Sequence, residues 1–499
     1  MPLKDEPVFN PDHTLDTPQY ADIKEAIAGV APRHGLRETD DYGVIAVSAP
    51  VTTNPISKRA LEHLRALLKF ETVNPPGNET PAARWVEQRL LAAGLEPVFL
   101  EPAEGRGNVV CRIAGATDEP PLLLTGHLDV VPVDLEHWDV PPFEAQIKNG
   151  YLYGRGTIDM KNHVASCLSI VEAIAQSGQT PRRDIIFAAV ADEEEGCAYG
   201  SRYLVEEHPE LVRAGWMIGE VGGHSMDVNG VRYYPVQIAE KGTALIRMTA
   251  KGEPGHGSAP HGQMAMTRLG EALAKLGNNR LPQHNTPVVE AFIRKLAAHQ
   301  PMPQRAVMPL LLKPALAEVL LTKLLSSSQA RSMGALLSNT VSATLLQGSV
   351  KFNIIPGEVS ATLDGRTLPG QTGQDLVREL RELLGDDLSF EILEECPSLS
   401  QPRAESPLFT AICDTLKRHD PAGIPLPTLI PGFTDAQYFS RLGARCYGFS
   451  PHRYPREDNI RFMDLFHGHN ERIHVDGYQW GVQMLTEVIE RFCGLKLLP

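Results

Sequence analysis

The chain has 499 residues, a length that favours two or three domains because domains usually contain roughly 100–200 residues. Hydrophobic residues make up 42% and charged residues 22% of the sequence, which is typical of a globular protein and excludes a disordered or fibrous one. The formal net charge is −14, and a surface of this sign disfavours nucleic acids and anionic membranes as partners.

The cysteines and the first residues bear on the cell compartment. The seven cysteines are odd in number and form no Cys-x-x-Cys pair, which argues against a disulfide framework and against a thiolate zinc site. Residues 1–6 lack the apolar segment of a signal peptide. We therefore expect a cytoplasmic protein.

The first half of the chain predicts alternating strands and helices. Residues 1–55 are expected to form an N-terminal arm with one short helix near 20–29. Helices follow at 57–68, with Ser57 as the N-cap, at 81–93, ended by Gly94, and at 161–177. The strands predicted in this half are 98–100, 108–113, 122–125, 184–190 and 216–218. This alternation predicts a parallel or mixed sheet with helices on both faces.

The pattern changes near residue 236 and returns near residue 406. Strands at 234–238, 243–250, 343–347 and 359–366 and helices at 264–277 and 373–384 predict a smaller α+β domain. Later helices are expected at 407–418 and 477–492, and later strands near 431 and at 445–449. We predict a catalytic domain in two parts, 56–237 and 397–499, interrupted by an inserted domain at 238–396.

The inserted domain contains an apolar stretch that resembles a membrane segment at first sight. Residues 306–325 are rich in leucine and valine, but they also include two prolines and three charged residues, which disfavour a spanning helix. We expect an amphipathic helical insertion, near 285–340, that packs on a domain, a partner subunit or an apolar ligand.

The segment Thr-Gly-His-Leu-Asp-Val-Val-Pro at 125–132 is the first motif that carries chemistry. His127 and Asp129 lie two residues apart after a buried strand, so an extended backbone directs both side chains to one face. The imidazole could bind a metal ion while the carboxylate receives its other N–H. Alternatively, His127 is a buried histidine that only forms a hydrogen bond to its neighbour.

Further acidic and imidazole residues stand where strands or turns should end. Asp159 lies in a glycine-rich turn, where it could instead cap the following helix. Glu193 and Glu194 belong to four consecutive carboxylates, which form either a solvated loop or a cation site. Glu220 follows another strand, and a His-x-His pair lies near the C-terminus. Open α/β sheets bind ligands at the carboxyl ends of their strands, and oxygen and nitrogen donors suit Zn²⁺, Mn²⁺ or Co²⁺.

The order of these motifs resembles one family. His-x-Asp-Val-Val-Pro, Gly-Arg-Gly-x-x-Asp-x-Lys and Asp-Glu-Glu are similar to motifs of the dinuclear zinc metallopeptidases that include aminoacylase, carboxypeptidase S, glutamate carboxypeptidase and succinyl-diaminopimelate desuccinylase (peptidase family M20). The tract 137–156 is most similar to the branch of carboxypeptidase S and the N-fatty-acyl amino acid hydrolases. The resemblance implies an α/β, mixed-sheet zinc-exopeptidase catalytic domain interrupted by an α+β lid or dimerisation domain.

The resemblance also implies two divalent metal ions, with Zn²⁺ expected and Co²⁺ or Mn²⁺ as alternatives. The ligands of one ion would be His127, Asp159 and Glu220. The ligands of the other would be Asp159, Glu194 and His467, so that Asp159 bridges the two ions. Spacing alone leaves His467 and His469 open, and the family pattern selects His467. The peptide bond after Asp159 is often cis in this family.

Three catalytic roles follow from the same resemblance. Glu193 would be the general base, and Asp129 would orient His127. His256, in a Gly-His-Gly-Ser turn, would stabilise the oxyanion, and in many members this histidine reaches the active site of a neighbouring subunit, which implies a possible homodimer. A simple turn residue is the alternative for His256.

The substrate carboxylate would be held by Asn353, Arg366 and the loop that contains Gly432. A surface ion pair is the alternative for Arg366. The expected substrate is a small N-acyl amino acid or short peptide with bulky apolar groups, cleaved at the amide or peptide bond next to a free carboxylate. The alternatives are a dinuclear aminopeptidase that recognises a free amine, with an acidic subsite in place of Arg366, and a non-catalytic binding protein on the same fold.

Overall fold

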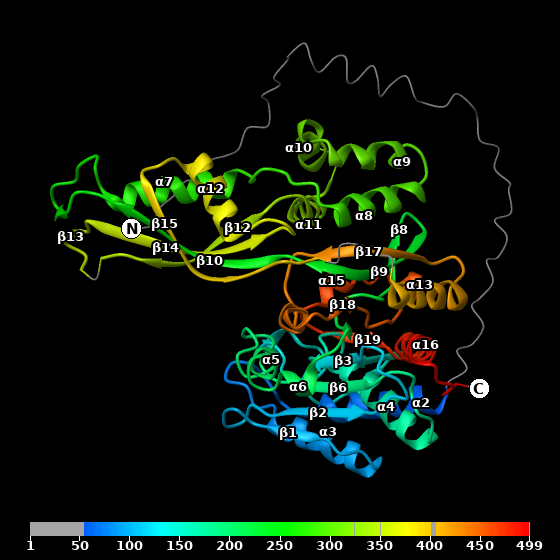
Figure 1. Ribbon diagram of the computed structural model, residues 1–499. Helices are drawn as coiled ribbons and strands as arrows, with labels where there is room; N and C mark the ends of the chain where they lie inside the picture. Colours follow the sequence, from blue (N-terminus) through cyan, green and yellow to red (C-terminus); the bar gives the residue numbers. More distant parts are fainter. Residues whose placement is uncertain (1–53, 324, 350, 401–405, 499) are drawn as a thin grey trace, which may run out of the picture. The chain divides into compact units, whose positions relative to one another are not determined.

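The computed structural model describes residues 54–323, 325–349, 351–400 and 406–498. The predicted N-terminal arm and its short helix lie outside the described residues. Within the described residues, most helices pack on one of two sheets, a large mixed sheet and a small antiparallel one (Figure 1). Strand–helix alternation therefore correctly predicts the mixed α/β fold.

The large sheet contains ten strands. Its main path runs through β1 (Val98–Leu100), β2 (Asn108–Ile113), β6 (Ile185–Val190), β3 (Leu122–His127), β7 (Trp216–Gly219), β18 (Arg445–Gly448), β9 (Val231–Glu240) and β16 (Leu399–Ser400). Two further strands, β8 (Met226–Val228) and β17 (Ile424–Ile430), also pair with β9. Because β3 pairs in parallel with β6 and β7, the carboxyl ends of these three strands meet at one edge.

Two hydrophobic cores cover the faces of the large sheet. On β3, Leu122 and Leu124 join one core and Leu123 joins the other, as expected for alternating side chains. The first core includes α2 (Pro55–Leu67), α3 (Thr80–Ala92), α4 (Lys161–Ser177), α13 (Pro407–His419) and α16 (Val475–Cys493). The second includes α5 (Ser201–Glu207), α6 (Pro209–Val212) and α14 (Ala436–Phe439).

The small sheet is antiparallel and has four strands. Their order is β12 (Thr340–Gln347), β14 (Glu358–Thr367), β10 (Gly242–Lys251) and β15 (Leu388–Cys396). The helices α7 (Ala265–Asn278) and α12 (Gly373–Leu384) share its hydrophobic core. Lys241 is the single residue between β9 of the large sheet and β10 of the small sheet. All four strands fall within the predicted inserted domain, whose boundaries stay a prediction. The strand predicted at 234–238 for this domain is instead part of β9 in the large sheet, and the fourth strand of the small sheet is β15, which was not predicted.

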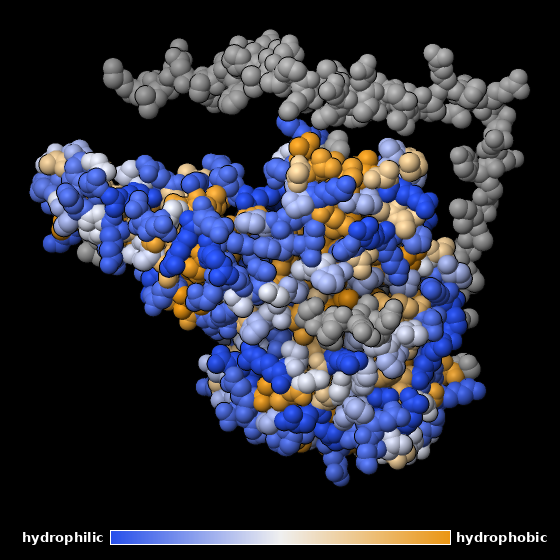
Figure 2. Space-filling view, turned by 45° about the horizontal axis from the view of Figure 1, so that its top comes forward, coloured by the Kyte–Doolittle hydropathy of each residue, from blue (hydrophilic) through white to orange (hydrophobic). Residues whose placement is uncertain are grey.

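Residues 285–340 form several short helices. They are α8 (Pro287–Ala298), α9 (Gln304–Val307), the 3-10 helix η2 (Met308–Leu312), α10 (Pro314–Lys323) and α11 (Ser327–Leu337). Pro309 and Pro314 lie at the starts of η2 and α10, where proline is tolerated. The helix α8 packs on β17 of the large sheet, as expected of an insertion that packs on a domain. Hydrophobic side chains gather on the surface of this helical region (Figure 2), including the partly exposed Leu316 and Val319.

The remaining elements are short. A three-stranded sheet contains β4 (Ile147–Lys148), β5 (Tyr151–Tyr153) and β19 (Arg472–His474), and a separate pair is formed by β11 (Gly255–His256) and β13 (Ile354–Ile355). The short helices are α15 (Phe462–Leu465) and the 3-10 helices η1 (Leu135–His137), η3 (Ser440–Leu442) and η4 (Arg456–Asp458). Within the described ranges, no helix combines the length and the apolar character that crossing a membrane requires.

The structure overturns one expectation about a helix start, Ser57 as N-cap, and one alternative, Asp159 as N-cap. The helix α2 begins at Pro55, and its N-cap is Asn54, whose side chain accepts a hydrogen bond from the backbone N–H of Ser57. Proline at the first helical position is favourable because its missing N–H has no partner there in any case. Asp159 does not cap α4, since the N-cap residue is Met160. The carboxylate of Asp159 is therefore available for other partners.

Candidate metal centre

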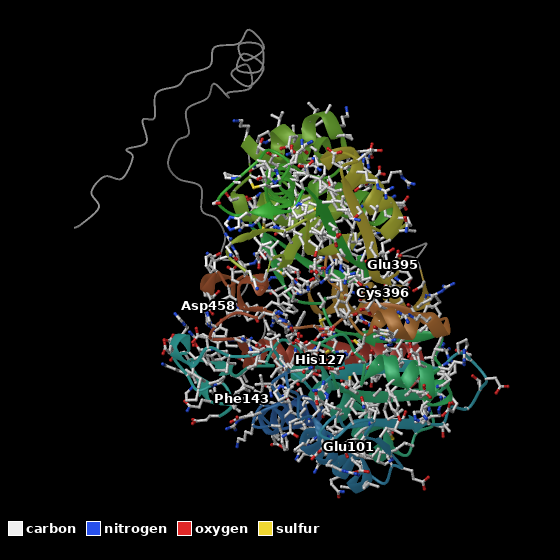
Figure 3. All side chains as sticks on the ribbon, turned by 90° about the vertical axis from the view of Figure 1, so that its left-hand side faces the viewer. Glu101, His127, Phe143, Glu395, Cys396 and Asp458 are labelled. Atoms are coloured by element: carbon white, nitrogen blue, oxygen red, sulfur yellow. The ribbon has the colours of Figure 1, made fainter. Side chains whose placement is uncertain are left out.

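Three neighbouring strand ends bring acidic and imidazole side chains to one edge of the large sheet. His127 is the last residue of β3, and Glu220 follows β7 directly. Glu193 and Glu194 lie in the turn just after β6. Figure 3 places His127 inside the part of the molecule that carries this sheet. Parallel pairing of β3 with β6 and β7 thus explains why residues far apart in the sequence meet here.

Each of the five predicted ligands lies within 3.7 Å of at least one other. Nε2 of His127 is 3.1 Å from Oδ1 of Asp159 and 3.7 Å from Oε2 of Glu220. Nε2 of His467 is 2.8 Å from Oδ2 of Asp159 and 3.3 Å from Oε2 of Glu194. The two oxygens of Asp159 therefore face different histidines, the arrangement expected of a bridging carboxylate. The role of these residues as ligands stays a prediction.

The C-terminal histidine pair separates into two environments. His467 contacts the carboxylates of the group, whereas the ring of His469 stacks on that of His137, with ring centroids 5.0 Å apart. The placement of His467 agrees with the choice that the family pattern made, which spacing alone could not make.

The group is buried and crowded with carboxylates. The side chains of His127, Asp159, Glu194 and Glu220 are at most 7% exposed, and that of His467 is 45% exposed. Burial raises the pKa of Glu220 to about 8 and that of Glu194 to about 7. These shifts follow because water is displaced and like charges lie close together, a cost that a bound cation offsets.

The chemistry of the donors fits a divalent metal ion. Two clusters have ligand atoms within 4.8 Å of one another, His127 with Glu193 and Glu220, and His127 with Asp159 and Glu194. Oε1 of Glu194 is buried and has no hydrogen-bond partner among the described residues, so one carboxylate oxygen beside the group is unpaired. Oxygen and imidazole donors without thiolates suit Zn²⁺, Mn²⁺ or Co²⁺.

Asp129 lies behind the group and is fully buried. Nδ1 of His127 is 3.0 Å from the backbone oxygen of Asp129 and 3.4 Å from its Oδ1. The same carboxylate accepts hydrogen bonds from the backbone N–H groups of Glu193 and Glu194, at 3.1 and 3.0 Å. Asp129 therefore contacts both the predicted ligand and the turn that carries the predicted base.

The backbone beside the predicted ligands adopts uncommon conformations. Asp192, Val221 and His467 have φ values of 68°, 52° and 56°. Residues other than glycine rarely adopt this left-handed region, and Val221 is β-branched, which makes it especially unusual there. Such conformations concentrate at functional sites. The Asp159–Met160 peptide bond is cis, as the resemblance implies.

Sequence reasoning missed the role of Glu471. This buried carboxylate accepts hydrogen bonds from the backbone N–H groups of Gly156 and Ile158 and forms an ion pair with Arg155 at 2.7 Å. It thus holds the glycine-rich turn that precedes Asp159. The only signal in the sequence was the presence of Arg155 in the Gly-Arg-Gly motif and of Glu471 just after the His-x-His pair. Nothing in the sequence pattern indicates that these two distant residues form a pair.

The predicted oxyanion residue His256 and the predicted substrate-binding residues fall into two places. His256 on β11 is exposed and pairs with Ile354 on β13, next to Asn353. Arg366 on β14 forms an ion pair with Asp364 at 2.8 Å. Among the contacts of the described residues, none joins His256 or Asn353 to the predicted ligands.

Arg366 also approaches the loop that contains Gly432. Its guanidinium lies 5.8 Å from the ring centroid of Phe433, within the range of a cation–π contact. An added Cβ at Gly432 would meet no atom within 4 Å, so open space lies beside this loop. The ion pair with Asp364 matches the alternative for Arg366, and its role in binding a substrate carboxylate stays a prediction.

The chain is similar to known hydrolases in sequence. It is 30% identical over 380 residues to N-fatty-acyl-amino acid synthase/hydrolase PM20D1 of Xenopus tropicalis, in a match that covers 74% of this chain and 72% of that protein. It is 28% identical over 445 residues to aminoacylase-1 of Mus musculus, covering 87% of this chain and 95% of the relative.

Solved structures share the fold. The metallo-carboxypeptidase Sso-CP2 of Sulfolobus solfataricus aligns with a TM-score of 0.61 at 18% identity, covering 87% of this chain and 99% of that one. The YXEP protein of Bacillus subtilis, described as a dinuclear metal binding peptidase, aligns with a TM-score of 0.53 at 14% identity, covering 87% and 97%. The model of peptidase family M20/M25/M40 matches residues 123–491, most of the chain. The protein therefore belongs to peptidase family M20/M25/M40, as the order of its motifs predicts.

Proposed function

We propose that the protein is a dinuclear metallohydrolase that cleaves the amide or peptide bond next to a free carboxylate, in an N-acyl amino acid or a short peptide. The observation that carries this proposal is the buried group of two histidines and four carboxylates at the carboxyl edge of β3, β6 and β7. The relatives named above hydrolyse bonds of this class according to their names, which supports the reaction type.

The metal ions proposed are two Zn²⁺, held by His127, Asp159, Glu194, Glu220 and His467. Thiolates are absent from this donor set, and imidazole with carboxylate is the ligand set of many catalytic zinc sites. Co²⁺ and Mn²⁺ suit the same donors. When bound, the ions would lower the pKa of a water molecule and polarise the scissile carbonyl group.

Glu193 is the proposed general base. Its backbone N–H is fixed by Asp129, and its Oε2 lies 3.8 Å from Nε2 of His127. Burial and the neighbouring Glu220 raise the pKa of Glu193 well above its ordinary value, which suits a group that exchanges protons near neutral pH. Glu193 would remove a proton from the attacking water and deliver it to the leaving nitrogen. His256 would stabilise the negative oxygen of the tetrahedral intermediate.

Recognition of a carboxylate is proposed for Arg366, together with Asn353 and the loop of Gly432. An arginine can bind a carboxylate through two parallel hydrogen bonds, which fixes its orientation. A set of paired substrates tests this point. An N-acyl amino acid should be hydrolysed at least about 10²-fold faster than its C-terminal amide, the size expected when one charge-assisted contact of roughly 3 kcal/mol is lost. A dipeptide with a free amine but an amidated carboxyl group that reacts faster would support the aminopeptidase alternative instead.

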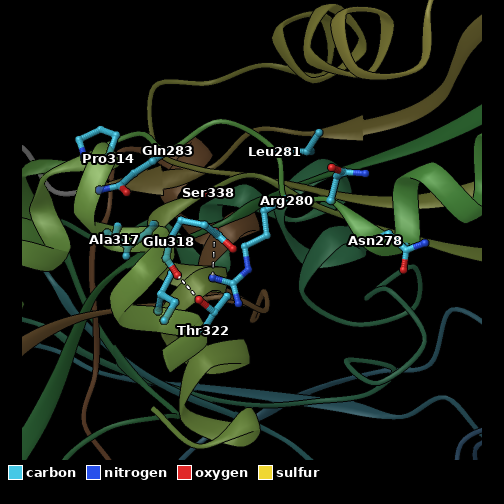
Figure 4. A pocket seen from close by; sticks show the side chains of 13 residues that line it. Asn278, Arg280, Leu281, Gln283, Pro314, Ala317, Glu318, Thr322 and Ser338 are labelled. Carbon is cyan, nitrogen blue, oxygen red and sulfur yellow. Dashed lines mark hydrogen bonds and ion pairs between the residues drawn. The ribbon is translucent and has the colours of Figure 1, made fainter. Parts of the chain in front are cut away.

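Bulky apolar groups are proposed on the acyl or side-chain part of the substrate. A pocket of about 620 Å³ lies between α10 and the end of α7 (Figure 4). Its lining is mixed, with Leu281 and Leu321 beside the polar Asn278, Arg280 and Glu318. Its size is within the range of ligand sites. None of its described lining residues is a predicted metal ligand. The role proposed for the pocket is therefore to bind the apolar group of the substrate and not to take part in the reaction.

Acyl-chain length and one substitution test the use of this pocket. Long-chain N-acyl amino acids should have a higher kcat/KM than N-acetyl amino acids. Leu321→Gln should lower kcat/KM for the long chain by about 10-fold and leave the acetyl substrate unchanged, because burying an amide without a partner costs roughly 1–3 kcal/mol. Leu316→Gln is the control, since Leu316 lies on the same helix but does not line the pocket. Equal rates on both substrates would contradict this preference.

Homodimer formation and a cytoplasmic location are also proposed. The edge strand β12 of the small sheet exposes Leu345 and Leu346, which favours pairing with a second copy through the inserted domain. All seven cysteines are free, as expected of a protein in a reducing compartment. Light scattering of the purified protein measures the first point, and cell fractionation measures the second.

A further inference from the structure

A buried arginine lies in a second layer behind the predicted metal centre. Arg106 is 4% exposed. Nη1 donates hydrogen bonds to Oδ1 of Asn74 at 3.3 Å and to the backbone oxygen of Pro76 at 2.9 Å. Nη2 forms ion pairs with Asp192 and, at 3.3 Å, with Glu79. One planar guanidinium thus connects two separate segments of the chain, residues 74–79 and Asp192.

The fit around this guanidinium is close. A Cβ added at Gly77 would lie 1.1 Å from Nη1 of Arg106, so the segment after Asn74 wraps directly around the charged group. The ring of Tyr199 lies on another side, with its centroid 5.4 Å from Cζ. A lysine carries the same charge, but its single nitrogen cannot reach partners on both sides of such a fork.

Asn74 and Asp192 connect Arg106 to Asp129. Nδ2 of Asn74 donates to Oδ2 of Asp129 at 2.9 Å and to Oδ1 of Asp192 at 3.1 Å. Both residues are buried, and Asp192 directly precedes Glu193. Because Arg106 fixes the amide oxygen of Asn74, the amide nitrogen is directed at the carboxylate of Asp129.

The carboxylate of Asp129 in turn meets three parts of the predicted centre, namely the ring of His127 and the backbone N–H groups of Glu193 and Glu194. A small rotation of this carboxylate would therefore move a ligand and the base together. Partners that orient metal ligands commonly change metal affinity or activity by about 10–100-fold when they are removed.

We propose that Arg106 is a positioning residue of the metal centre, which acts through Asn74 and Asp192 on Asp129 and so sets the geometry of His127, Glu193 and Glu194. This inference rests on the proposed function, because it assumes that these residues bind metal and activate water. It assigns a role to residues outside the predicted ligand and substrate sites.

The experiment compares Arg106→Lys with Arg183→Lys. Arg183 is a matched control because it is also buried, forms an ion pair with Glu119, donates to a backbone oxygen at 3.0 Å, and lies over the ring of Phe492. Metal-free protein is titrated with Zn²⁺ in competition with a chromogenic chelator, and the unfolding temperature, kcat and KM are measured alongside. The lysine keeps the positive charge, so a change in Zn²⁺ affinity reports geometry.

Arg106→Lys should weaken Zn²⁺ binding by about 10–100-fold and lower kcat at saturating Zn²⁺, with KM within twofold of the original protein. Arg183→Lys should lower the unfolding temperature but leave Zn²⁺ affinity within twofold. Asn74→Leu should weaken Zn²⁺ binding as well, and it decides the question if Arg106→Lys does not fold. The double variant should lose less affinity than the product of the two single effects, because both act through Asp129.

Two results would overturn this inference. One is a folded Arg106→Lys or Asn74→Leu protein whose Zn²⁺ affinity stays within twofold of the original. The other is an equal loss in Arg183→Lys, which would mean that affinity only follows stability. An unsubstituted protein that binds no Zn²⁺ would instead overturn the proposed function itself.

Discussion

At the scale of single residues, the predicted base and a predicted ligand are neighbours in the sequence, and their roles can be separated. Glu193 and Glu194 both belong to clusters that could hold a metal ion. Only Glu194 contacts His467, while Glu193 lies nearest to His127 and Glu220. The two proposed roles therefore predict different effects of substitution, a loss of catalysis for the base and a loss of metal for the ligand.

Glu193→Gln should lower kcat by about 10²–10⁴-fold, because the amide cannot accept a proton from water. The metal content should stay at that of the unchanged protein, as measured by elemental analysis after gel filtration. Glu195→Gln is the control, because Glu195 lies two residues further along the same turn and is exposed. This variant should keep full activity. Loss of metal from Glu193→Gln would identify Glu193 as a ligand.

Another prediction at this scale concerns Glu172, a buried carboxylate in α4. It lies 2.9 Å from Nε2 of His63 and 3.0 Å from Nε of both Arg59 and Arg89. Burial by itself raises the pKa of Glu172, but these three partners outweigh burial and hold the pKa below its ordinary value. The ionised form therefore stabilises the fold at neutral pH, and this contribution is lost as the pH falls through the lowered pKa.

Glu172→Gln should reduce the free energy of unfolding by about 2 kcal/mol at pH 7, since a charge-assisted network loses its anion. The difference from the unchanged protein should shrink as the pH falls below 4.5, the ordinary value for this group. Glu206→Gln, in an exposed pair with Arg202, should change stability by less than about 0.5 kcal/mol. Denaturant titrations across pH measure both, and a difference that grows in acid would contradict the assignment.

At the scale of elements, two helical glycines have opposite surroundings. Gly481 lies in the buried helix α16, where an added Cβ would lie 1.6 Å from the backbone oxygen of Pro451. Gly270 lies in α7, where an added Cβ would meet no atom within 4 Å. The close approach of a backbone explains why α16 needs glycine at this position, whereas α7 does not.

Gly481→Ala should destabilise the protein by about 1–3 kcal/mol or more, because the backbone of residue 451 must shift. Gly270→Ala should stabilise it by about 0.5–1 kcal/mol, the gain of alanine over glycine inside a helix. Thermal unfolding of both variants measures the sign of each change. A stabilised Gly481→Ala protein would contradict this close approach, because it would mean that the space between α16 and the backbone of residue 451 can hold a methyl group.

The elements also show which parts of the fold could be predicted. Apolar runs predicted most strands of the large sheet, but not β8 or β16, and the strand at 234–238 was expected in the inserted domain. The predicted ligands at the ends of β3, β6 and β7 do lie close together, while their role as ligands stays a prediction. The cap of α2 was misplaced because Ser57 and Asn54 are both good capping residues. The partners Arg106 and Glu471 could not be predicted, because an ion pair between distant segments leaves no pattern in a single sequence.

At the scale of the whole molecule, bound metal should stabilise the fold. A ligand that binds only the folded state adds about 2.7 kcal/mol when its free concentration is 100 times its dissociation constant. Removing the metal with a chelator should therefore lower the unfolding temperature by several degrees, and added Zn²⁺ should restore it. In Asp159→Asn the chelator should have little effect, because the predicted bridge between the two ions is lost. Calorimetry measures both, and a chelator effect that persists unchanged would contradict a bridging Asp159.

The distance along the chain between partners has a consequence for biosynthesis. Arg155 and Glu471 pair although 316 residues separate them, and His467 reaches Asp159 from the same C-terminal loop. Contacts of such long separation form slowly, since the intervening chain must first be ordered. During synthesis, the carboxylates at the ends of β3, β6 and β7 would emerge before this loop, and the proposed metal site would be complete only after His467 has been made. The proposed site would therefore assemble only when segments from both ends of the catalytic domain have folded together.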